Sequence, residues 1–449
     1  MHVCLSNTSA SRWQRHATVD GNVFGGGNES PSRSNTEVII KGDVEVTKDV
    51  FGGGNIANVD GSTTVGIQGG TVLTDVYGGG ALANTGNTTV NLSGGTIVHD
   101  VYGGGLGQKT GFFDATSDVE ALVNGNTLVE LNKNTATDNC VVMGSIFGCN
   151  NRNGTPTGTV LVHVYKTAGN GSTNVRTPSD KLFSPTAADH KYELMAVYGG
   201  GNEAPIAGNI QIKLGCITSL SEIYGGARLA NVGSADKNCD VVLNITSGHF
   251  DRVFGGNNID GIIYGSITVN IEETGCHPIT IGELYGCGNQ ARYTTPAGKA
   301  DPTINVKSFT SIGRIFGGGL GAGAVVTGNP TININETLGD NALQTSDYAG
   351  TTRTLSDGST VDLPAHTSGE MGVIGSVFGG GNAAKVDGNT TVNIGTQMGE
   401  SIVFVTPETA TEAQRTKTVL GVDIKNNVFG GGNKADVTGK TNVKIGKEN

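Results

Sequence analysis

Carboxylates are the residues most able to do chemistry in this chain, and their spacing decides what chemistry is open to them. A glycosidase needs two carboxylates roughly 5–10 Å apart. Glu37 and Glu130 occupy similar outward positions of predicted strands but belong to distant repeats. Further acids fall in predicted loops, at Asp180, Glu193, Asp347, Asp357, Glu400 and Glu408. Spacing singles out no pair, so we assign no catalytic residue and lean towards a non-enzyme.

Histidine, cysteine and glycine give no cofactor or metal site either. His163 is predicted to face outward, and His190 and His366 fall in insertions, so we interpret all three as solvated. There is no CxxC pair to hold zinc. Cys149, Cys287, Cys216 and Cys276 recur in equivalent repeat positions, which favours small buried core residues over redox or metal chemistry. The glycine-rich motif described below is repeated and precedes strands, unlike a phosphate-binding loop that opens a helix.

Charge and hydropathy exclude two classes of partner. The formal net charge is −11, whereas a nucleic-acid-binding surface is basic. No run of 18 apolar residues is present to span a bilayer as a helix. Residues 1–16 lack the apolar core of a signal peptide, so export would depend on a signal outside this sequence.

The chain is organised by a repeated motif in which an aliphatic residue and an aromatic residue precede Gly, usually as Gly-Gly-Gly-Asn. We call the aromatic residue the anchor, and most successive anchors lie 25 to 31 residues apart. The anchors are Phe24, Phe51, Tyr77, Tyr102, Phe147, Tyr198, Tyr224, Phe254, Tyr285, Phe316, Phe378 and Phe429. The glycine after each anchor predicts either a positive φ or a backbone approach too close for a Cβ atom.

The fourth residue after the anchor is usually Asn, which tolerates left-handed turns and bonds to equivalent residues above and below. These asparagines are Asn28, Asn55, Asn151, Asn202, Asn258, Asn289, Asn382 and Asn433. We expect both sets, anchors and asparagines, to form structural ladders.

Between anchors lies a strand of the pattern Thr-x-Val-x-Ile, in which Val90 and Leu92 point to one side and Asn91 to the other. A module with such short strands buries its inner face only by stacking on neighbouring modules. The sequence therefore predicts an all-β, right-handed parallel β-helix of about twelve or thirteen coils. We expect an N-terminal cap over residues 1–20 and the helix over residues 21–449.

Four segments interrupt the period, at residues 106–123, 165–191, 336–371 and 396–425. Three of them leave the module at the same point, which predicts hairpin insertions along one edge. Asp357-Gly358 is a hairpin turn signal within one of these segments. The insertions are either tolerated decorations or the binding face. On the second interpretation, deleting 336–371 and 396–425 together abolishes binding and leaves the fold intact. The stop at Gly446, partway through a module, predicts a segment of a longer protein.

The repeats resemble a known group of proteins. Residues 49–55 read DVFGGGN, and the 387–394 region contains GNTTVNI. Modules of this kind look like the repeats of very large surface proteins of gut Bacteroidetes and some Firmicutes, and the resemblance covers roughly residues 21–446 without the insertions. It implies extracellular display, adhesin-like or autotransporter-like stalks and a pectate-lyase-like superhelix. It carries no catalytic residues onto this chain.

The leading functional hypothesis is therefore a non-catalytic extracellular or cell-surface protein, either an adhesin-like stalk or a module that binds a glycan or a host protein through its insertions. A carbohydrate-active enzyme on a β-helix scaffold, a lyase or a glycoside hydrolase, is the main alternative. A purely structural spacer is the third. We expect no cofactor, no nucleic acid partner and no membrane insertion by this segment.

Overall fold

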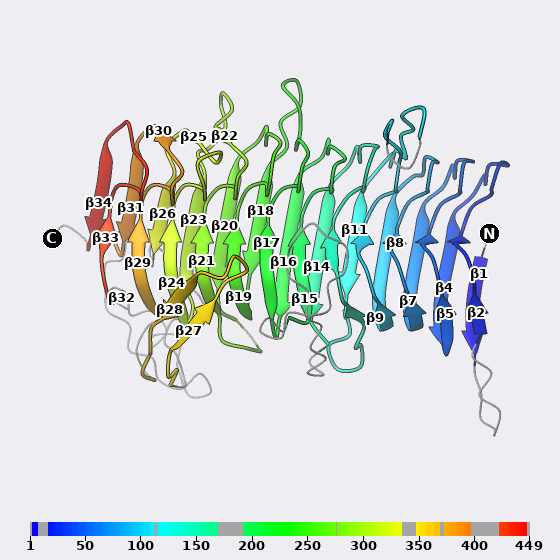
Figure 1. Cartoon of the computed structure of the whole chain (residues 1–449), viewed down its shortest axis with the longest axis horizontal. Helices are drawn as coiled ribbons and strands as arrows, with labels where there is room; N and C mark the ends of the chain where they lie inside the picture. Colours follow the sequence, from blue (N-terminus) through cyan, green and yellow to red (C-terminus); the bar gives the residue numbers. More distant parts are fainter. Residues whose placement is uncertain are drawn as a thin grey trace, which may run out of the picture. The chain divides into compact units, whose positions relative to one another are not determined.

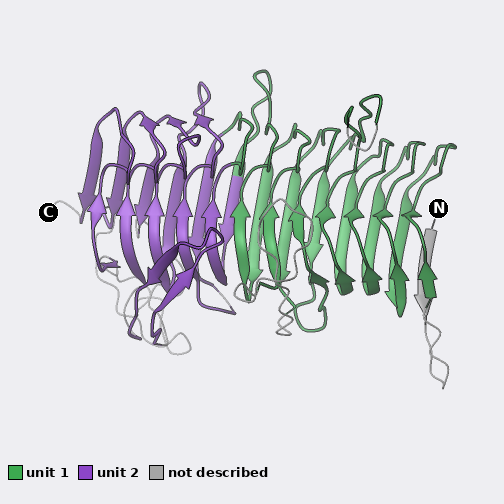
Figure 2. Cartoon of the chain, viewed as in Figure 1, with its two compact units in different colours: residues 1–241, 257–265 green, residues 242–256, 266–449 purple. Residues whose placement is uncertain are grey.

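The computed structural model of the 449-residue chain describes the backbone of residues 2–7 and all of residues 17–111, 115–168, 192–274, 276–334, 347–368, 372–396 and 422–446. Across these ranges the regular elements are strands, with no helix. The chain divides into two compact units, residues 1–241 with 257–265 and residues 242–256 with 266–449 (Figure 2). Each unit is a stack of parallel strands.

In unit 1 the longer strands form one parallel sheet, here called sheet A, in which consecutive coils are neighbours (Figure 1). Short strands flank this sheet, since β2 pairs with β5, β5 also pairs with β7, and β12 pairs with β9. The strands are β1 (His2–Asn7), β4 (Thr36–Gly42), β7 (Thr63–Val72), β9 (Thr88–Ile97), β11 (Thr127–Leu131), β14 (Val160–Lys166) and β16 (Ile210–Cys216), with β2 (Ala17–Val19), β5 (Val44–Val46) and β12 (Val141–Val142) beside them.

The anchors of unit 1 end the strands of a second parallel sheet, here called sheet B. Its strands are β3 (Val23–Phe24), β6 (Val50–Phe51), β8 (Val76–Tyr77), β10 (Val101–Tyr102), β13 (Ser145–Phe147), β15 (Leu194–Tyr198) and β17 (Leu220–Tyr224). Alternation of sheet A and sheet B strands along the chain, with parallel pairing in both, makes this unit a parallel β-helix. β1 and β2 both join sheet A, where they pair with β4 and β5.

Unit 2 repeats the same arrangement. Its sheet A strands are β18 (Val241–Ile245, whose first residue belongs to unit 1), β20 (Ile267–Glu272), β23 (Thr303–Ser308), β26 (Thr331–Ile334), β31 (Thr390–Ile394) and β34 (Thr441–Ile445). Its sheet B strands are β19 (His249–Phe254), β21 (Thr280–Tyr285), β24 (Ser311–Phe316), β29 (Val373–Phe378), β32 (Asp423–Ile424) and β33 (Val428–Phe429). The prediction of an all-β parallel β-helix is confirmed.

Two smaller sheets complete unit 2. A three-stranded parallel sheet contains β22 (Tyr293–Thr294), β25 (Val326–Thr327) and β30 (Val386–Asp387). An antiparallel hairpin is formed by β27 (Thr351–Thr354) and β28 (Thr360–Leu363). Gly358, in the turn between them, has φ +79°. The Asp357-Gly358 turn signal therefore predicted this hairpin correctly.

The core lies on the inner face of sheet A. Val90 and Leu92 of β9 are 0% and 1% exposed, and Val65 and Ile67 stand beside them in register on β7. This alternation follows from the two-residue period of a strand, because every second side chain points inward. The inner face is therefore an aliphatic stack from coil to coil.

The glycine after most anchors is required by close backbone approach rather than by a positive φ. A Cβ atom on Gly52 would lie 2.3 Å from the carbonyl oxygen of Gly78 in the next coil. The same contact recurs at Gly78, against Gly103. Neither glycine is among those with positive φ. A side chain at this position would push two coils apart.

Candidate functional site

The anchor side chains form stacked ladders within each unit. Neighbouring rings in unit 1 have centroids 4.5 to 4.9 Å apart and nearly parallel planes. In unit 2 the spacing is 4.8 to 4.9 Å. Tyr77 and Tyr285 are 1% and 0% exposed, which raises their pKa well above the ordinary value. Stacked rings of this kind hold neighbouring coils together.

The asparagines four residues after the anchors bond to each other and to the anchor hydroxyls. Asn55 Nδ2 donates to Asn28 Oδ1 at 2.7 Å, and Asn202 and Asn433 repeat this bond on Asn151 and Asn382. Bonds to tyrosine hydroxyls come from Asn151 to Tyr77, Asn258 to Tyr198 and Asn382 to Tyr285. Asn289 lies half-buried in the turn after β21. These side-chain amides therefore stabilise the stacking of the coils.

A second column stands two residues before the anchors, a position that the sequence analysis did not consider. Residues two apart on a strand share a face, and Tyr77 Oη accordingly donates to Asp75 at 2.9 Å. In four successive pairs of unit 1 a side-chain oxygen of the column also accepts the backbone N–H of its counterpart in the next coil. These pairs are Asn22 with Asp49, Asp49 with Asp75, Asp75 with Asp100 and Asp100 with Ser145.

His99 adjoins this column and bonds through Nδ1 to Asp75. Asp75, His99 and Asp100 are the one group of potential metal ligands found in the described part of the chain, with donor atoms within 4.8 Å of one another. Burial, the largest effect, raises the pKa of Asp49 in the same column. Both Asp75 and Asp100 already accept backbone N–H groups, so a structural role accounts for this cluster.

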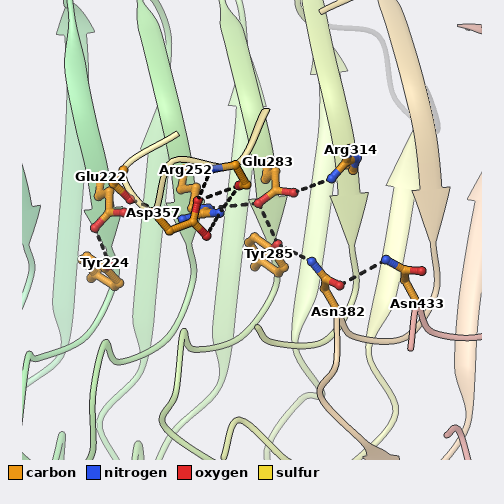
Figure 3. Close-up of polar contacts among 11 residues, drawn as sticks. Glu222, Tyr224, Arg252, Glu283, Tyr285, Arg314, Asp357, Asn382 and Asn433 are labelled. Atoms are coloured by element: carbon orange, nitrogen blue, oxygen red, sulfur yellow. Dashed lines mark hydrogen bonds and ion pairs between the residues drawn. The ribbon is translucent and has the colours of Figure 1, made fainter. Parts of the chain in front are cut away.

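In unit 2 the same column becomes an alternation of charges (Figure 3). Arg252 Nε donates to Glu283 Oε2 at 3.0 Å, and their side chains are 6% and 2% exposed. Arg314 contacts the other oxygen of Glu283 at 3.1 Å. Tyr285 donates its hydroxyl to the same carboxylate at 2.9 Å. Glu283 therefore has protein partners on both oxygens.

The β27–β28 hairpin covers this column. Arg252 Nη2 donates to Asp357 at 2.7 Å (Figure 3), and Arg353 donates to the carbonyl oxygen of Phe250 at 2.6 Å. Leu355 and Val361 are 0% and 2% exposed. Apolar burial and ion pairs hold residues 347–368 against sheet B, so deleting this part of segment 336–371 is expected to cost stability.

The hairpin's apolar side chains fit against glycines of sheet B. A Cβ atom on Gly282 would lie 2.9 Å from a methyl carbon of Leu355, and one on Gly313 would lie 2.5 Å from a methyl carbon of Val361. His366, which the sequence analysis interpreted as solvated, is 4% exposed. That interpretation is wrong because the residue after the hairpin is packed rather than free.

The other insertions are described in part. Residues 106–111 and 115–123 form a turn in which Gln108 and Val119 bond through their backbones, and Lys109 reaches the carbonyl oxygen of Glu203 at 3.0 Å. Glu193 follows the second insertion and is 7% exposed. Asp347 caps Ser368. Most of segments 165–191 and 396–425, including Asp180, His190, Glu400 and Glu408, lies outside the described residues.

The cysteine prediction holds in part. Cys149 and Cys287 are free thiols with 0% exposure, as predicted for core residues. Cys216 and Cys276 are instead disulfide-bonded. The prediction was wrong for these two because their positions lie at or beyond strand ends, where Cys276 is exposed and Cys216 is partly exposed.

The side chains on the outer face of sheet A differ between the two units. In unit 2 one register position holds an asparagine ladder, in which each Nδ2 donates to the Oδ1 of the preceding coil at 2.9 Å. Its members are Asn244, Asn270, Asn305, Asn333 and Asn393. In unit 1 the column that contains Asn91 continues with unlike residues, namely Glu130, His163 and Lys213.

A pocket of about 290 Å³ opens beside Glu130 on this face. We call it the Glu130 pocket, and its lining residues are Asn91, Leu92, Ser93, Glu130, Lys133, Asn134 and Asp138. One wall is the loop 132–140, in which Asn132 bonds through its side chain to Cys140 and Lys166. Asn134 N donates to Asp138 Oδ2 at 2.9 Å and closes the loop on itself.

The charges around Glu130 are arranged by its neighbours. Lys133 Nζ contacts the carboxylate at 2.9 Å, and the Tyr165 hydroxyl donates to it at 2.9 Å. The ring of His163 stacks on Tyr165 with centroids 3.6 Å apart. Burial, and then the positive charge of Lys213, lower the pKa of His163, so its ring is neutral near pH 7. His163 therefore faces outward as predicted, with a ring that is partly exposed and stacked on Tyr165 rather than freely solvated.

No protein-family model, curated protein or solved structure matches this chain. Within the described residues, no helix is long and apolar enough to cross a bilayer.

Proposed function

We propose that this protein is a non-catalytic extracellular or cell-surface protein, an adhesin-like stalk or a module that binds a glycan or a protein. The observation that carries this proposal is the use of polar side chains in ladders. Asparagine and aspartate oxygens of Asn28, Asp49 and Asn270 accept bonds from the next coil. Residues committed in this way stabilise coil stacking and do not act on a substrate.

The disulfides at Cys216 and Cys276 support an oxidising compartment. Disulfides persist in extracellular and periplasmic proteins and are rare in the reducing cytosol. Four free cysteines lie in the described part of the chain, Cys140, Cys149, Cys239 and Cys287, and all four are buried, so export leaves no exposed thiol among them.

Protease treatment of intact source cells, followed by a glycan and protein array with the purified chain, tests this proposal. We expect cleavage of the protein on intact cells, binding to at least one arrayed ligand and no release of reducing ends from polysaccharides. Protection from external protease would refute surface display. An absence of array binding would leave the structural spacer as the better account.

A carbohydrate-active enzyme is the second candidate, and one observation favours it. Glu130 and Asp138 line the same pocket, and glycoside hydrolysis uses a pair of carboxylates. Release of reducing ends by the wild-type protein, lost in both Glu130→Gln and Asp138→Asn, would establish this alternative over the non-catalytic proposal.

A further inference from the structure

The Glu130 pocket lies beside a position where one residue of a side-chain column cannot donate a hydrogen bond to the preceding residue. In the asparagine ladder of unit 2, the Oδ1 of Asn270 accepts the Nδ2 of Asn305 in the next coil. In unit 1 the residue that follows Asn91 in register is Glu130, whose carboxylate has no hydrogen to donate. The Oδ1 of Asn91 is accordingly buried without a hydrogen-bond partner among the described residues.

A buried acceptor without a donor is costly, and such groups are normally satisfied by protein, water or ligand. Asn91 and Glu130 are neighbours across two paired strands, and both residues line the pocket. We propose that the Glu130 pocket binds one unit of an uncharged saccharide, whose hydroxyl groups donate to Asn91 and Glu130. This inference rests on the proposed binding role and gives it a location and a ligand class.

The charge of the pocket favours an uncharged ligand. Glu130 is neutralised by Lys133, whose side chain is 64% exposed and lies at the rim. Asp138 faces the same pocket and disfavours an anionic sugar. A cationic ligand would compete with Lys133 for the same carboxylate. Sugar hydroxyls both donate and accept, which matches a site holding carboxylates, amides and an ammonium group.

Size and rigidity agree with this ligand. The volume of about 290 Å³ lies just below the range of about 300–1,000 Å³ for ligand pockets, so the pocket suits a single sugar unit. The loop wall is held by the side chain of Asn132 and the Asn134–Asp138 bond. The Tyr165 hydroxyl holds the Glu130 carboxylate in place by donating a hydrogen bond to it. A preformed wall reduces the entropy lost on binding.

One alternative explains the same atoms without a ligand. A rotated Asn91 amide would donate Nδ2 to Glu130 and satisfy both groups. Under that arrangement the ladder is closed, and replacing the Glu130 carboxylate has no effect on saccharide binding.

The test is binding of the full chain to defined probes, measured by calorimetry. Cellohexaose, mannohexaose and xylohexaose are the neutral probes, polygalacturonate is the anionic probe, glucosamine hexamer is the cationic probe, and calcium chloride tests for a metal. Glu130→Gln changes the acceptor set, and Tyr165→Phe removes the supporting hydroxyl while keeping the ring. Glu272→Gln is the matched control, because Glu272 also pairs with a lysine across coils, Lys307 at 3.0 Å, outside the pocket.

We expect at least one neutral probe to bind and its affinity to fall about tenfold or more in Glu130→Gln and several-fold in Tyr165→Phe. Glu272→Gln should bind like the wild type, and thermal melts should show all three variants folded. Preference for the anionic probe, the cationic probe or calcium overturns the inference. So does neutral-probe binding that both pocket variants retain, an outcome that places the site elsewhere and leaves the proposed binding role standing. No binding to any neutral probe also overturns it.

Discussion

Arg252 offers the sharpest test of how unit 2 is held together. Its guanidinium bonds to Glu283 and Asp357 at once, and the Arg252 and Glu283 side chains are 6% and 2% exposed. Arg252→Met removes one partner of a buried ion pair and leaves a buried carboxylate short of positive charge. Breaking such a pair costs about 3–5 kcal/mol, and the expected loss of stability is of that size.

Arg314 supplies the matched control, because it contacts the same carboxylate from a more exposed position. Its side chain is 39% exposed, and exposed ion pairs contribute about 0–1 kcal/mol. Arg314→Met should therefore cost about 1 kcal/mol or less. The double variant Arg252→Met with Glu283→Leu should recover much of the loss, since replacing both partners of a buried pair by apolar residues is often neutral.

Native-state hydrogen exchange is the assay, because stacked coils open locally and need not unfold in one step. Protection of the amides of β19, β21 and the β27–β28 hairpin should fall in Arg252→Met, and protection elsewhere in unit 2 should change less. Equal losses for Arg252→Met and Arg314→Met would refute the argument from burial. A double variant as unstable as the sum of its single changes would refute the argument from pairing.

Three further predictions follow from the fold. Gly52→Ala should lower the melting temperature, because its Cβ would meet a carbonyl oxygen at 2.3 Å, whereas Gly21→Ala, with nothing within 4 Å, should be neutral. Burial raises the pKa of Asp357, but the hydrogen bonds from Ser359 and Arg252 and the charge of Arg252 together outweigh burial and hold that pKa at about 2. The stabilisation from Asp357 is present above the ordinary pKa near 4 and is lost as the pH falls towards 2, so the hairpin should become protease-sensitive over that interval. In denaturant without reductant, alkylation should spare Cys216 and Cys276, and labelling of both should require prior reduction; direct labelling would contradict the disulfides.

The repeat could be predicted because its cause is local and recurs. Each anchor is followed by a glycine that only a close coil-to-coil approach requires, as at Gly52, and each Thr-x-Val-x-Ile strand carries its own two-residue period. Twelve copies of one physical constraint make the period visible in a single sequence. The hairpin turn at Asp357-Gly358 was equally local, since the turn type depends on adjacent residues.

Features that depend on distant partners were missed. The packing of Leu355 and Val361 against Gly282 and Gly313 joins residues far apart in sequence. The alternation of apolar residues on the hairpin indicates only that one of its faces is buried. Cys216 was misjudged because a repeated position does not specify whether a side chain points inward. The loop 132–140, which walls the Glu130 pocket, was hidden because the long interval between Tyr102 and Phe147 was assigned wholly to segment 106–123.

Some register positions hold the same residue in successive coils, and others hold unlike residues. This contrast also indicates where function lies on a repetitive scaffold. An asparagine in such a ladder needs an acceptor in one neighbouring coil and a donor in the other, so each ladder constrains its own composition. A departure leaves a group unpaired unless another partner appears. At Glu283 that partner is protein, namely Arg252, Arg314 and Tyr285. At Asn91 no donor is found among the described residues, and the break coincides with a pocket. The two breaks therefore differ in kind, and the second is the one that calls for a ligand.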